Sequence, residues 1–534
     1  MSLDFFFVPL AAKAGASLDQ VKLITCLLAS YPLGNLFVKI PSTQPTLKHL
    51  FSVAVASFYF VPVLNQGWPF LLLLGDVLAT YFIALTVQGP RMPWIVFCFM
   101  MGHLFFNHID RALHGDPFDG SYNITGPQMV LVMKLTTFAW NTWDGRRPVG
   151  DLDKWQTKMR VAKFPSLLEF LGFSLYFPGI LVGPYLEYAT YRSLIDGTLF
   201  DDATNKSGPR GRPLPDGRKR TAYRKMLLAL GFLGIFMGVA PKISFQTAVT
   251  DWFLEQSLLY KILVLQLAGF VERSKYYGVW TLTEGASILT GLGFTGYTPS
   301  GVATWNGAAN VEVLKIEVPE NFKVLVDSWN IKTNVWLREC VYKRVTPKGQ
   351  KAGFQSSMLT YLTSAIWHGV SAGYYLTFLL GGFITTVARL TRSTVRPLVL
   401  PPVSGPTDSK AANGNDTKQS TPPPTLIKTA YDVAGTVCTV LVVNFACTPF
   451  ILLHLSDAVE AWRRLHWYGL WMVFGSMAFF YSGGTAWLKG IQAKRVRHVN
   501  AAAVSTSGPG TPGVAPTVPP VDVVFREAEN KLSL

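Results

Sequence analysis

The stretch MLTYLTSAIWHGVSAGYYLTFLLGGFITTV, residues Met358–Val387, contains one histidine and no Asp, Glu, Lys or Arg. A helix needs about 20 mostly apolar residues to cross the hydrocarbon core of a bilayer, and this run exceeds that length. Backbone polar groups in lipid have no water to bind, so they must be satisfied within a helix or a closed barrel. The run therefore predicts membrane-embedded structure with His368 inside it.

Similar apolar runs recur along the chain, with most charges between them. They are Val21–Val38, Phe51–Val63, Phe70–Val87, Trp94–Phe106, Phe164–Val182, Met226–Val239, Phe253–Phe270, Trp280–Phe294, Tyr431–Leu455 and His466–Trp487. The composition agrees, because 49% of the residues are hydrophobic and only 15% are charged, against about a quarter in soluble proteins. Period-two alternation is absent, which excludes membrane-spanning strands. The sequence predicts an all-α, multi-pass helical bundle with about eleven spans.

Two segments are too rich in Pro, Ser, Thr, Asn and Gly to pack a core. We therefore expect four parts. They are a membrane-embedded catalytic core over residues 1–395, a disordered loop over 396–428, C-terminal transmembrane helices over 429–492 and a disordered tail over 493–534.

The net charge of +16 is concentrated in short stretches. They are Arg210–Arg224, Arg338–Lys351, Arg389–Arg396 and Lys489–His498. Such clusters are typical of cytoplasmic loops beside membrane spans. A second, compatible interpretation is that they recruit the phosphates of lipid head groups or of a nucleotide cosubstrate. Nucleic-acid binding is not expected, because the clusters flank spans and lack interleaved exposed aromatic residues.

A polar segment, DSWNIKTNVWLRECVYKRVTPKGQK, covers Asp327–Lys351. If it is helical, Asn330, Thr333, Asn334 and Leu337 share one face. That polar stripe could line a cavity, or the segment could be an amphipathic helix at the membrane interface.

Two further segments carry polar groups beside or within apolar runs. His368 is an ionisable residue inside a span, which points to function, although a hydrogen bond to another helix is the plain alternative. Arg273 and Lys275, with Tyr276 and Tyr277, directly precede a span. They fit either a docking rim for phosphate or an aromatic boundary with snorkelling cations.

The histidines near residue 108 could suggest a metal site, since His103, His108, Asp110 and His114 lie close together in the sequence. The gaps between the histidines do not place them on one helical face, however. We expect a polar network near the end of a span and no metal.

Taken together, these segments resemble the membrane-bound O-acyltransferase family, and more narrowly its fungal-type broad-specificity lysophospholipid acyltransferases. The matching motifs are Trp143-Asp144-Gly145, RSKYYGVW at Arg273–Trp280, WNIKTNVWLRECVYKR at Trp329–Arg344 and SAIWHGVSAGYY at Ser364–Tyr375. Their order and spacing agree with the family. One position departs from it, because Ala372 replaces the family proline before Gly-Tyr.

The resemblance implies that His368 is the catalytic histidine and Asn330 its partner, both facing a tunnel inside the membrane. His368 would take the proton of the attacking hydroxyl, and Asn330 would orient that hydroxyl or donate to the oxyanion. Substrate-binding roles are expected for Arg273, Lys275, Tyr276, Tyr277, Trp329, Thr333, Asn334, Trp336, Arg338, Trp367, Gly373 and Tyr374.

The implied reaction moves a fatty acyl group from acyl-CoA, as cosubstrate, to the free hydroxyl of a lysophospholipid, without cofactor or metal, in the endoplasmic reticulum membrane. A sterol, a diacylglycerol or a protein hydroxyl is the alternative acceptor. A lipid transporter or scramblase is less favoured, because intramembrane charges along a path are scarce.

Overall fold

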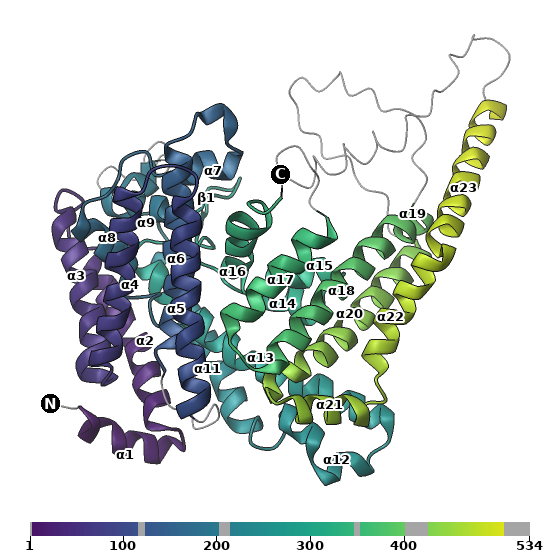
Figure 1. Ribbon diagram of the computed structural model, residues 1–534, viewed down its shortest axis with the longest axis horizontal. Coiled ribbons are helices and arrows are strands. Elements are labelled where there is room, and N and C mark those ends of the chain that lie inside the picture. The colour runs from purple at the N-terminus through teal and green to yellow at the C-terminus, as the bar shows by residue number, and fades with distance from the viewer. Residues whose placement is uncertain (1–2, 116–122, 202–213, 347–352, 401–424, 507–534) are drawn as a thin grey trace. The chain divides into compact units, whose positions relative to one another are not determined.

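A computed structural model describes residues 3–115, 123–201, 214–346, 353–400 and 425–506. These residues are mostly helical (Figure 1). They fall into two units, one formed by residues 1–386 with 435–473 and one formed by 387–434 with 474–534. The residues that match the family motifs all belong to the first unit.

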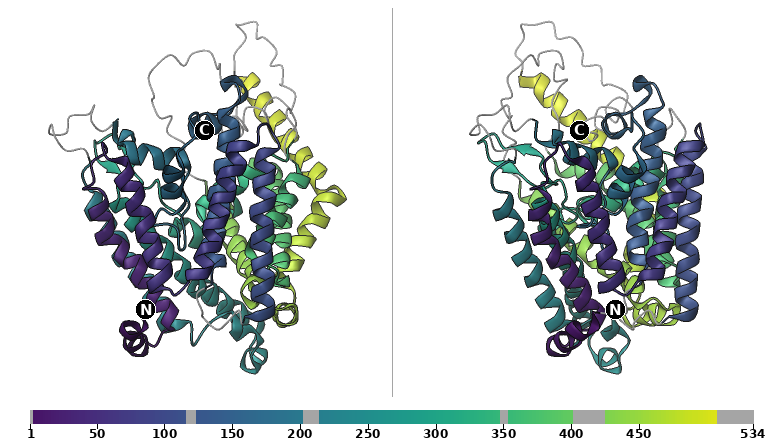
Figure 2. Two further views of the ribbon diagram at one scale, coloured as in Figure 1. Left: turned by 60° about the vertical axis from the view of Figure 1, so that its left-hand side comes forward. Right: turned by 90° about the vertical axis from the view of Figure 1, so that its left-hand side faces the viewer.

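The first unit begins with long helices that run roughly parallel to one another (Figure 2). Its helices are α1 (Asp4–Ala14), α2 (Leu18–Phe37), α3 (Pro45–Phe58), α4 (Gly67–Thr86), α5 (Met92–His114), α6 (Thr125–Gly145), α7 (Lys154–Met159), α8 (Leu167–Ser174), α9 (Tyr188–Asp196), α11 (Arg218–Val239), α12 (Asp251–Glu255), α13 (Leu258–Leu289), α14 (Val313–Glu317), α15 (Phe322–Ser328), α16 (Ile331–Trp336), α17 (Phe354–His368) and α21 (Leu455–Arg464). Short π turns cover Tyr59–Val63 and Leu337–Tyr342, and 3-10 turns cover Val149–Asp151, Thr198–Phe200 and Phe245–Val249. A small antiparallel pair is formed by β1 (Gly296–Tyr297) and β2 (Ala303–Thr304).

Three helices belong to both units: α18 (Ala372–Thr394), α20 (Leu426–Leu452) and α22 (Tyr468–Phe479). The second unit also contains α19 (Arg396–Val399), a π turn at Phe480–Gly484 and α23 (Thr485–Thr506). Within it, Arg495 donates to the carbonyl of Pro397 at 3.1 Å, which ties α23 to α19. The predicted loop over 396–428 and tail over 493–534 lie largely outside the described residues, but α23 continues to Thr506.

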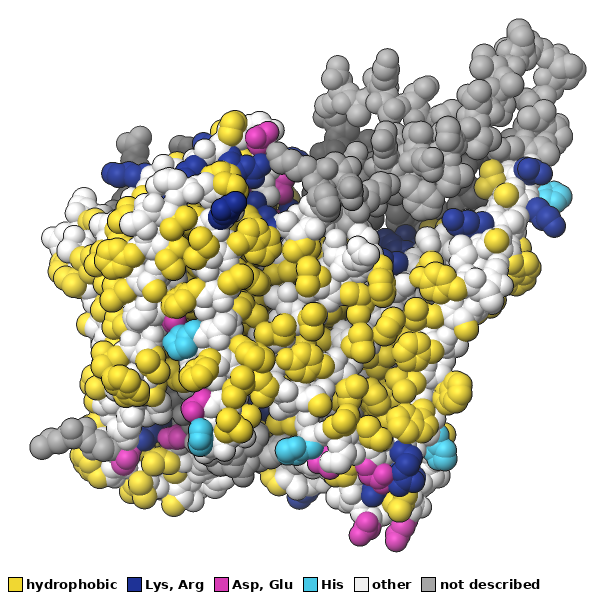
Figure 3. Space-filling view, viewed as in Figure 1, with side chains coloured by type: hydrophobic (Ala, Val, Ile, Leu, Met, Phe, Trp, Pro, Cys, Tyr) yellow, Lys and Arg dark blue, Asp and Glu magenta, His cyan; other side chains and the backbone are white. Residues whose placement is uncertain are grey.

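Five helical segments of the described residues are long and apolar enough to cross a membrane. They are Pro45–Val63, Gly67–Thr86, Met92–His114, Arg218–Val239 and Leu426–Leu452. Hydrophobic side chains cover most of the face that α4, α5 and α17 present in Figure 3. Large apolar side chains of α4 and α5, such as Leu71, Phe82 and Phe106, are exposed, as expected for a surface in contact with lipid. The protein is therefore a multi-pass helical membrane protein, whereas the predicted count of about eleven spans is not confirmed.

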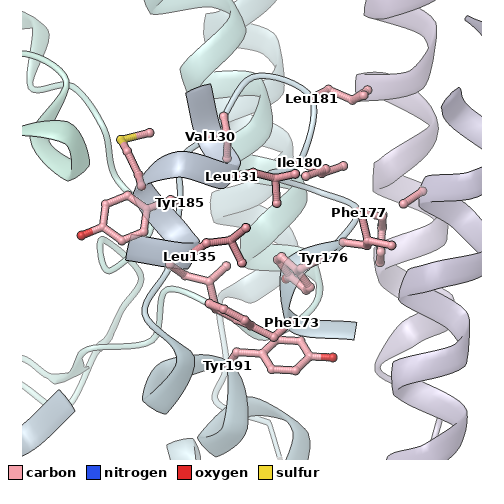
Figure 4. Close-up of a cluster of buried hydrophobic side chains, with 14 of the residues drawn as sticks. Val130, Leu131, Leu135, Phe173, Tyr176, Phe177, Ile180, Leu181, Tyr185 and Tyr191 are labelled. Carbon is pink, nitrogen blue, oxygen red and sulfur yellow. The ribbon is translucent and has the colours of Figure 1, made fainter. Parts of the chain in front are cut away.

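The central helix α6 is absent from the apolar runs read from the sequence. It carries Gln128, Lys134, Asn141 and Asp144, yet all four are buried. Lys134 donates to the carbonyl oxygens of Phe173 and Ser174. Because α6 is surrounded by protein, polar side chains can find partners there that lipid would not provide. Figure 4 shows its residues Val130, Leu131 and Leu135 beside the side chains of the segment from Phe173 to Leu181.

Four predicted runs have other boundaries. Phe253–Phe270 and Trp280–Phe294 are largely joined in the 32-residue helix α13, whose charged middle at Glu272, Arg273 and Lys275 is half-buried. Phe164–Val182 is not one helix, because α8 ends at Ser174. Met358–Val387 divides into α17 and α18 at Gly369, whose φ of 140° is unfavourable for residues with a side chain.

Candidate active site

His368 is the last residue of α17, directly before the turn that leads into α18. Its ring is surrounded by four aromatic side chains. The ring centroids of Trp367, Tyr374, Phe378 and Phe450 lie 4.7, 5.8, 5.1 and 4.9 Å away. Among the described residues, neither imidazole nitrogen has a hydrogen-bond partner. The nitrogens of His368 are therefore free to bind a substrate group in apolar surroundings.

Phe450, on α20, was not identified from the sequence. It lies in the apolar run Tyr431–Leu455, where nothing distinguishes a residue facing the site from one facing lipid. Tyr374, an expected substrate-binding residue, lies beside His368.

Ala372, which replaces the family proline, is the first residue of α18. Proline is favoured at a helix start because its fixed φ is already helical, and alanine adopts that φ without strain.

Gly373 packs against the end of α20. Its backbone N–H donates to the carbonyl of Leu453 at 3.1 Å, and a methyl group on Gly373 would overlap the carbonyl oxygen of Pro449. Gly373 was expected to bind substrate, but its contacts show that it lets α18 pack closely on α20. This packing explains why the position has no side chain, and substrate is not needed to explain it.

We expect Gly373→Ala to lower the amount and the melting temperature of folded protein. The new methyl group meets backbone rather than a flexible side chain, and overpacking typically costs about 1–3 kcal/mol or more. Gly234→Ala on α11 is the matched control, since no atom lies within 4 Å of a methyl group there. Thermal unfolding followed by size-exclusion chromatography measures both variants. Equal melting temperatures would contradict the packing role.

Asn330 directly precedes α16 and has the left-handed backbone conformation, with φ 45° and ψ 54°. The helix predicted from Asn330 onward therefore begins one residue later, although Thr333 still reaches back to it. The side-chain oxygen of Asn330 accepts from Thr333 at 2.8 Å and from the amide of Asn310 at 3.1 Å. Among the described residues, its amide nitrogen has no hydrogen-bond partner.

The orientation of the Asn330 amide follows from its neighbours. The side-chain oxygen of Asn310 accepts the backbone N–H of Lys332 at 3.0 Å, so the other end of the Asn310 amide must be the donor. That donor requires an acceptor, which fixes the Asn330 oxygen toward Asn310. The two free N–H groups of Asn330 are therefore directed elsewhere. Asn310 is a buried residue that sequence reasoning missed, because its own segment contains no polar pattern.

The RSKYYGVW segment lies in α13 and supports the residue before Asn330. The Trp329 ring packs against Tyr276, Tyr277 and Trp280, with centroids 5.5, 6.0 and 5.2 Å away. Arg273 forms two hydrogen bonds with Glu317, at 2.8 and 2.7 Å. The Tyr277 hydroxyl donates to the same carboxylate.

The cations of this segment are therefore paired. Arg273 is bound by Glu317, and Lys275 pairs with Glu272 and lies over the rings of Phe236 and Tyr276. A phosphate would have to compete with these carboxylates. Of the two roles, the geometry favours holding Trp329 in place. It disfavours the phosphate-docking rim that was proposed from the sequence.

The basic stretch from Arg338 onward is also largely paired. Arg344 forms a buried bidentate contact with Asp144 of the Trp-Asp-Gly motif, including a 2.9 Å hydrogen bond. Lys343 bridges Asp153 and Glu339 at 2.7 and 2.8 Å. Partial burial alone would raise the pKa of Asp153, but hydrogen bonds from Gln156 and Lys343 hold that pKa below its ordinary value.

Among the described residues of this stretch, Arg338 is the exception. Its side chain is 51% exposed, and within the described residues it pairs through its Nε alone, with Glu339 at 2.9 Å. The two terminal nitrogens of its guanidinium remain available for a phosphate.

The residues next to His368 and those next to Asn330 both contact helix α6. The Trp367 indole donates to the carbonyl of Met129 at 3.1 Å, and the Thr333 hydroxyl contacts the sulfur of Met133 at 3.2 Å. Met129 and Met133 are about one turn apart on α6. The fully buried ring of Trp336 packs on Trp367, with a centroid distance of 5.7 Å. The neighbours of His368 and Asn330 thus meet at α6, although no hydrogen bond joins the two side chains within the described residues.

The remaining residues of the expected list are placed as follows. The side chain of Asn334 makes two long contacts, both at 3.4 Å, to the carbonyl of Val326 and to the carboxylate of Asp327 on α15. Trp336 donates to Thr136 at 2.9 Å and has no exposed surface. These two side chains hold α16 in place.

The histidines of α5 have separate partners. His103 contacts Asp76 at 2.6 Å, His108 contacts the carbonyl of Trp367 at 3.1 Å, and the exposed His114 contacts Asp110 at 3.0 Å. No group of three potential metal ligands occurs in the part of the chain that the structure describes.

These features define an integral membrane protein in which a histidine side chain and the amide nitrogen of an asparagine, both without a hydrogen-bond partner among the described residues, lie around one buried helix. Residues 115–403 match the membrane-bound O-acyltransferase family. The chain is 36% identical to a lysophospholipid acyltransferase of Schizosaccharomyces pombe over 464 residues, 87% of this chain and 86% of the relative. It is 32% identical to a lysophospholipid acyltransferase of Saccharomyces cerevisiae, over 87% of this chain and 74% of the relative. A membrane-bound glycerophospholipid O-acyltransferase 1 of Mus musculus is 28% identical, over 86% of this chain and 89% of the relative. The chain belongs to the membrane-bound O-acyltransferase family.

Proposed function

We propose that the protein is a lysophospholipid O-acyltransferase that takes fatty acyl groups from acyl-CoA. The names of the two fungal relatives and the family assignment support acyl transfer to a lysophospholipid. The mechanism rests on two groups that have no hydrogen-bond partner among the described residues, the imidazole of His368 and the amide N–H groups of Asn330. Residues next to both groups contact α6.

The reaction proceeds by direct attack. The imidazole of His368 takes the proton from the lysophospholipid hydroxyl while that oxygen bonds to the thioester carbonyl carbon. The carbonyl oxygen becomes an oxyanion, to which the free N–H groups of Asn330 donate. Collapse of this intermediate breaks the carbon–sulfur bond, and the imidazolium returns the proton to the leaving thiolate. The products are a diacyl phospholipid and free CoA.

Of the two roles expected for Asn330, the structure supports donation to the oxyanion. Its carbonyl oxygen already accepts two hydrogen bonds, from Thr333 and Asn310, so it is poorly placed to orient a hydroxyl as an acceptor. The aromatic rings around His368 exclude water from the reacting atoms, which protects the thioester from hydrolysis.

The site is proposed to line a tunnel within the membrane, and the protein to reside in the endoplasmic reticulum. Release of CoA thiol from purified protein given acyl-CoA and a lysophospholipid tests the activity. A sterol, a diacylglycerol and a peptide hydroxyl serve as competing acceptors in the same assay. Faster thiol release with one of these acceptors would replace the proposed substrate, and no release with any acceptor would refute acyl transfer.

We expect Arg338→Met to raise the KM for acyl-CoA about tenfold while changing kcat little. The exposed guanidinium would bind CoA phosphate similarly in the ground and transition states, so its loss weakens binding uniformly. Arg273→Met is the informative comparison, because it leaves the half-buried carboxylate of Glu317 without its cation and should lower stability instead. An unchanged KM in Arg338→Met would show that Arg338 does not bind the coenzyme.

A further inference from the structure

A closed circuit of side-chain and backbone hydrogen bonds links α5, α6 and α17 beside His368. His108 of α5 contacts the carbonyl oxygen of Trp367 at 3.1 Å. The Trp367 indole donates to the carbonyl of Met129 on α6 at 3.1 Å. Asn107 donates to the side chain of Gln128 at 2.7 Å. Because residues 107 and 108 are neighbours, as are residues 128 and 129, these three contacts close a ring, which we call the His108 circuit.

The protonation of His108 follows from its partner. A carbonyl oxygen can only accept, so the Nε2 of His108 carries the hydrogen and donates it to Trp367. In the neutral ring, Nδ1 is then unprotonated. This atom lies 3.5 Å from the position that a side chain on Gly369 would occupy. His108, which is 7% exposed, therefore contacts the residue immediately before His368 and lies beside the residue immediately after it.

The end of α17 needs such a partner. The last four carbonyl groups of a helix have no donor within the helix, and Trp367 is the penultimate residue of α17. In surroundings that exclude water, an unsatisfied carbonyl costs about 1–3 kcal/mol. His108 supplies the missing donor for Trp367 at the point where the chain turns away after His368.

The axial position of α5 is itself fixed by buried polar contacts. Asp76 of α4 binds His103 at 2.6 Å and accepts from Gln128 of α6 at 3.0 Å. Sliding α5 along its neighbours would separate these groups in an apolar environment, which is costly. The Asp76 contacts thus hold the helix that presents His108.

We propose that His108 is a positioning residue for His368, setting the place of the catalytic imidazole through the backbone of Trp367 and Gly369. The inference rests on the acyl transfer proposed above. His108 does not itself take the substrate proton. A small displacement of a reacting group can cost about 10²-fold in rate, so this hydrogen bond would affect kcat more than substrate binding.

The test compares His108→Leu, which removes the donor, with His108→Gln, whose side-chain amide can still donate to the Trp367 carbonyl. We expect kcat to fall about 10- to 100-fold in His108→Leu with KM within about threefold of wild type, and to recover most of that loss in His108→Gln. Val96→Ala on the same helix is the control, since it trims a fully buried side chain without removing a hydrogen bond.

Hydrogen exchange at the Gly369 amide provides a measurement independent of activity. That amide donates to the Ala365 carbonyl at 3.1 Å, and its exchange should be faster in His108→Leu than in His108→Gln or Val96→Ala. If His108→Leu does not fold, the comparison rests on His108→Asn, which is too short to reach the carbonyl. Wild-type kcat and exchange in a folded donor-less variant, or equal losses in His108→Gln and His108→Leu, would overturn the positioning role. A wild-type protein that releases no CoA thiol would instead refute the proposed function, and the exchange comparison would still decide whether the circuit holds the turn.

Discussion

His368→Ala should lower kcat for acyl transfer about 10²- to 10⁴-fold while leaving the folded protein intact, because it removes the group proposed to take the hydroxyl proton. The ring makes aromatic contacts but no hydrogen bond within the described residues, so its loss affects packing less than chemistry. CoA thiol release per mole of monodisperse protein measures kcat directly. Melting temperature, recorded on the same sample, separates inactivity from unfolding.

His114→Ala is the matched control for this substitution. His114 is an exposed histidine on α5 whose only described contact is with Asp110 on the same helix. It should retain wild-type turnover. Retention of more than about a tenth of wild-type turnover in His368→Ala would exclude His368 as the general base.

The sequence predicted the membrane class and proposed the polar residues of the candidate site, but it did not predict which side chains support those residues. Apolar runs identify α4 and α5, which are long and apolar enough to cross a membrane. The same criterion passes over α6, because a helix enclosed by protein can carry Lys134 and Asp144 once each has a partner. Hydropathy measures the affinity of a segment for lipid, and α6 is not in contact with lipid.

Charge was similarly ambiguous in the sequence. Arg273 and Lys275 fit a phosphate rim as long as their partners are unknown, but the carboxylate of Glu317 lies 44 residues further along the chain from Arg273. Long-range ion pairs of this kind leave no local pattern. The role of His108 was also hidden, because its partner is distant in the sequence. Its spacing from the other histidines argues against a metal, and only the folded chain reveals its contact with Trp367, 259 residues away.

Asn330→Gly should lower kcat about 10²- to 10³-fold, the loss expected for removing one oxyanion donor. Glycine is the appropriate replacement because Asn330 has a φ of 45°, a conformation that costs alanine about 1–2 kcal/mol and glycine nothing. Asn65→Gly makes the same chemical change at another left-handed asparagine, with φ 56°, outside the site. It should therefore leave turnover unchanged.

The double variant Asn330→Gly/His368→Ala tests whether the two residues act in one step. An oxyanion donor stabilises charge that develops only as the hydroxyl attacks, and that attack depends on the base. Residues that act as a unit lose activity non-additively, so the double variant should be scarcely slower than His368→Ala alone. Multiplicative losses would instead place Asn330 and His368 in independent roles. Trp367 and Thr333 contact Met129 and Met133 on α6. With independent roles, these contacts would place two separate pockets beside one helix. With a shared role, they place the two sides of a single reaction centre there.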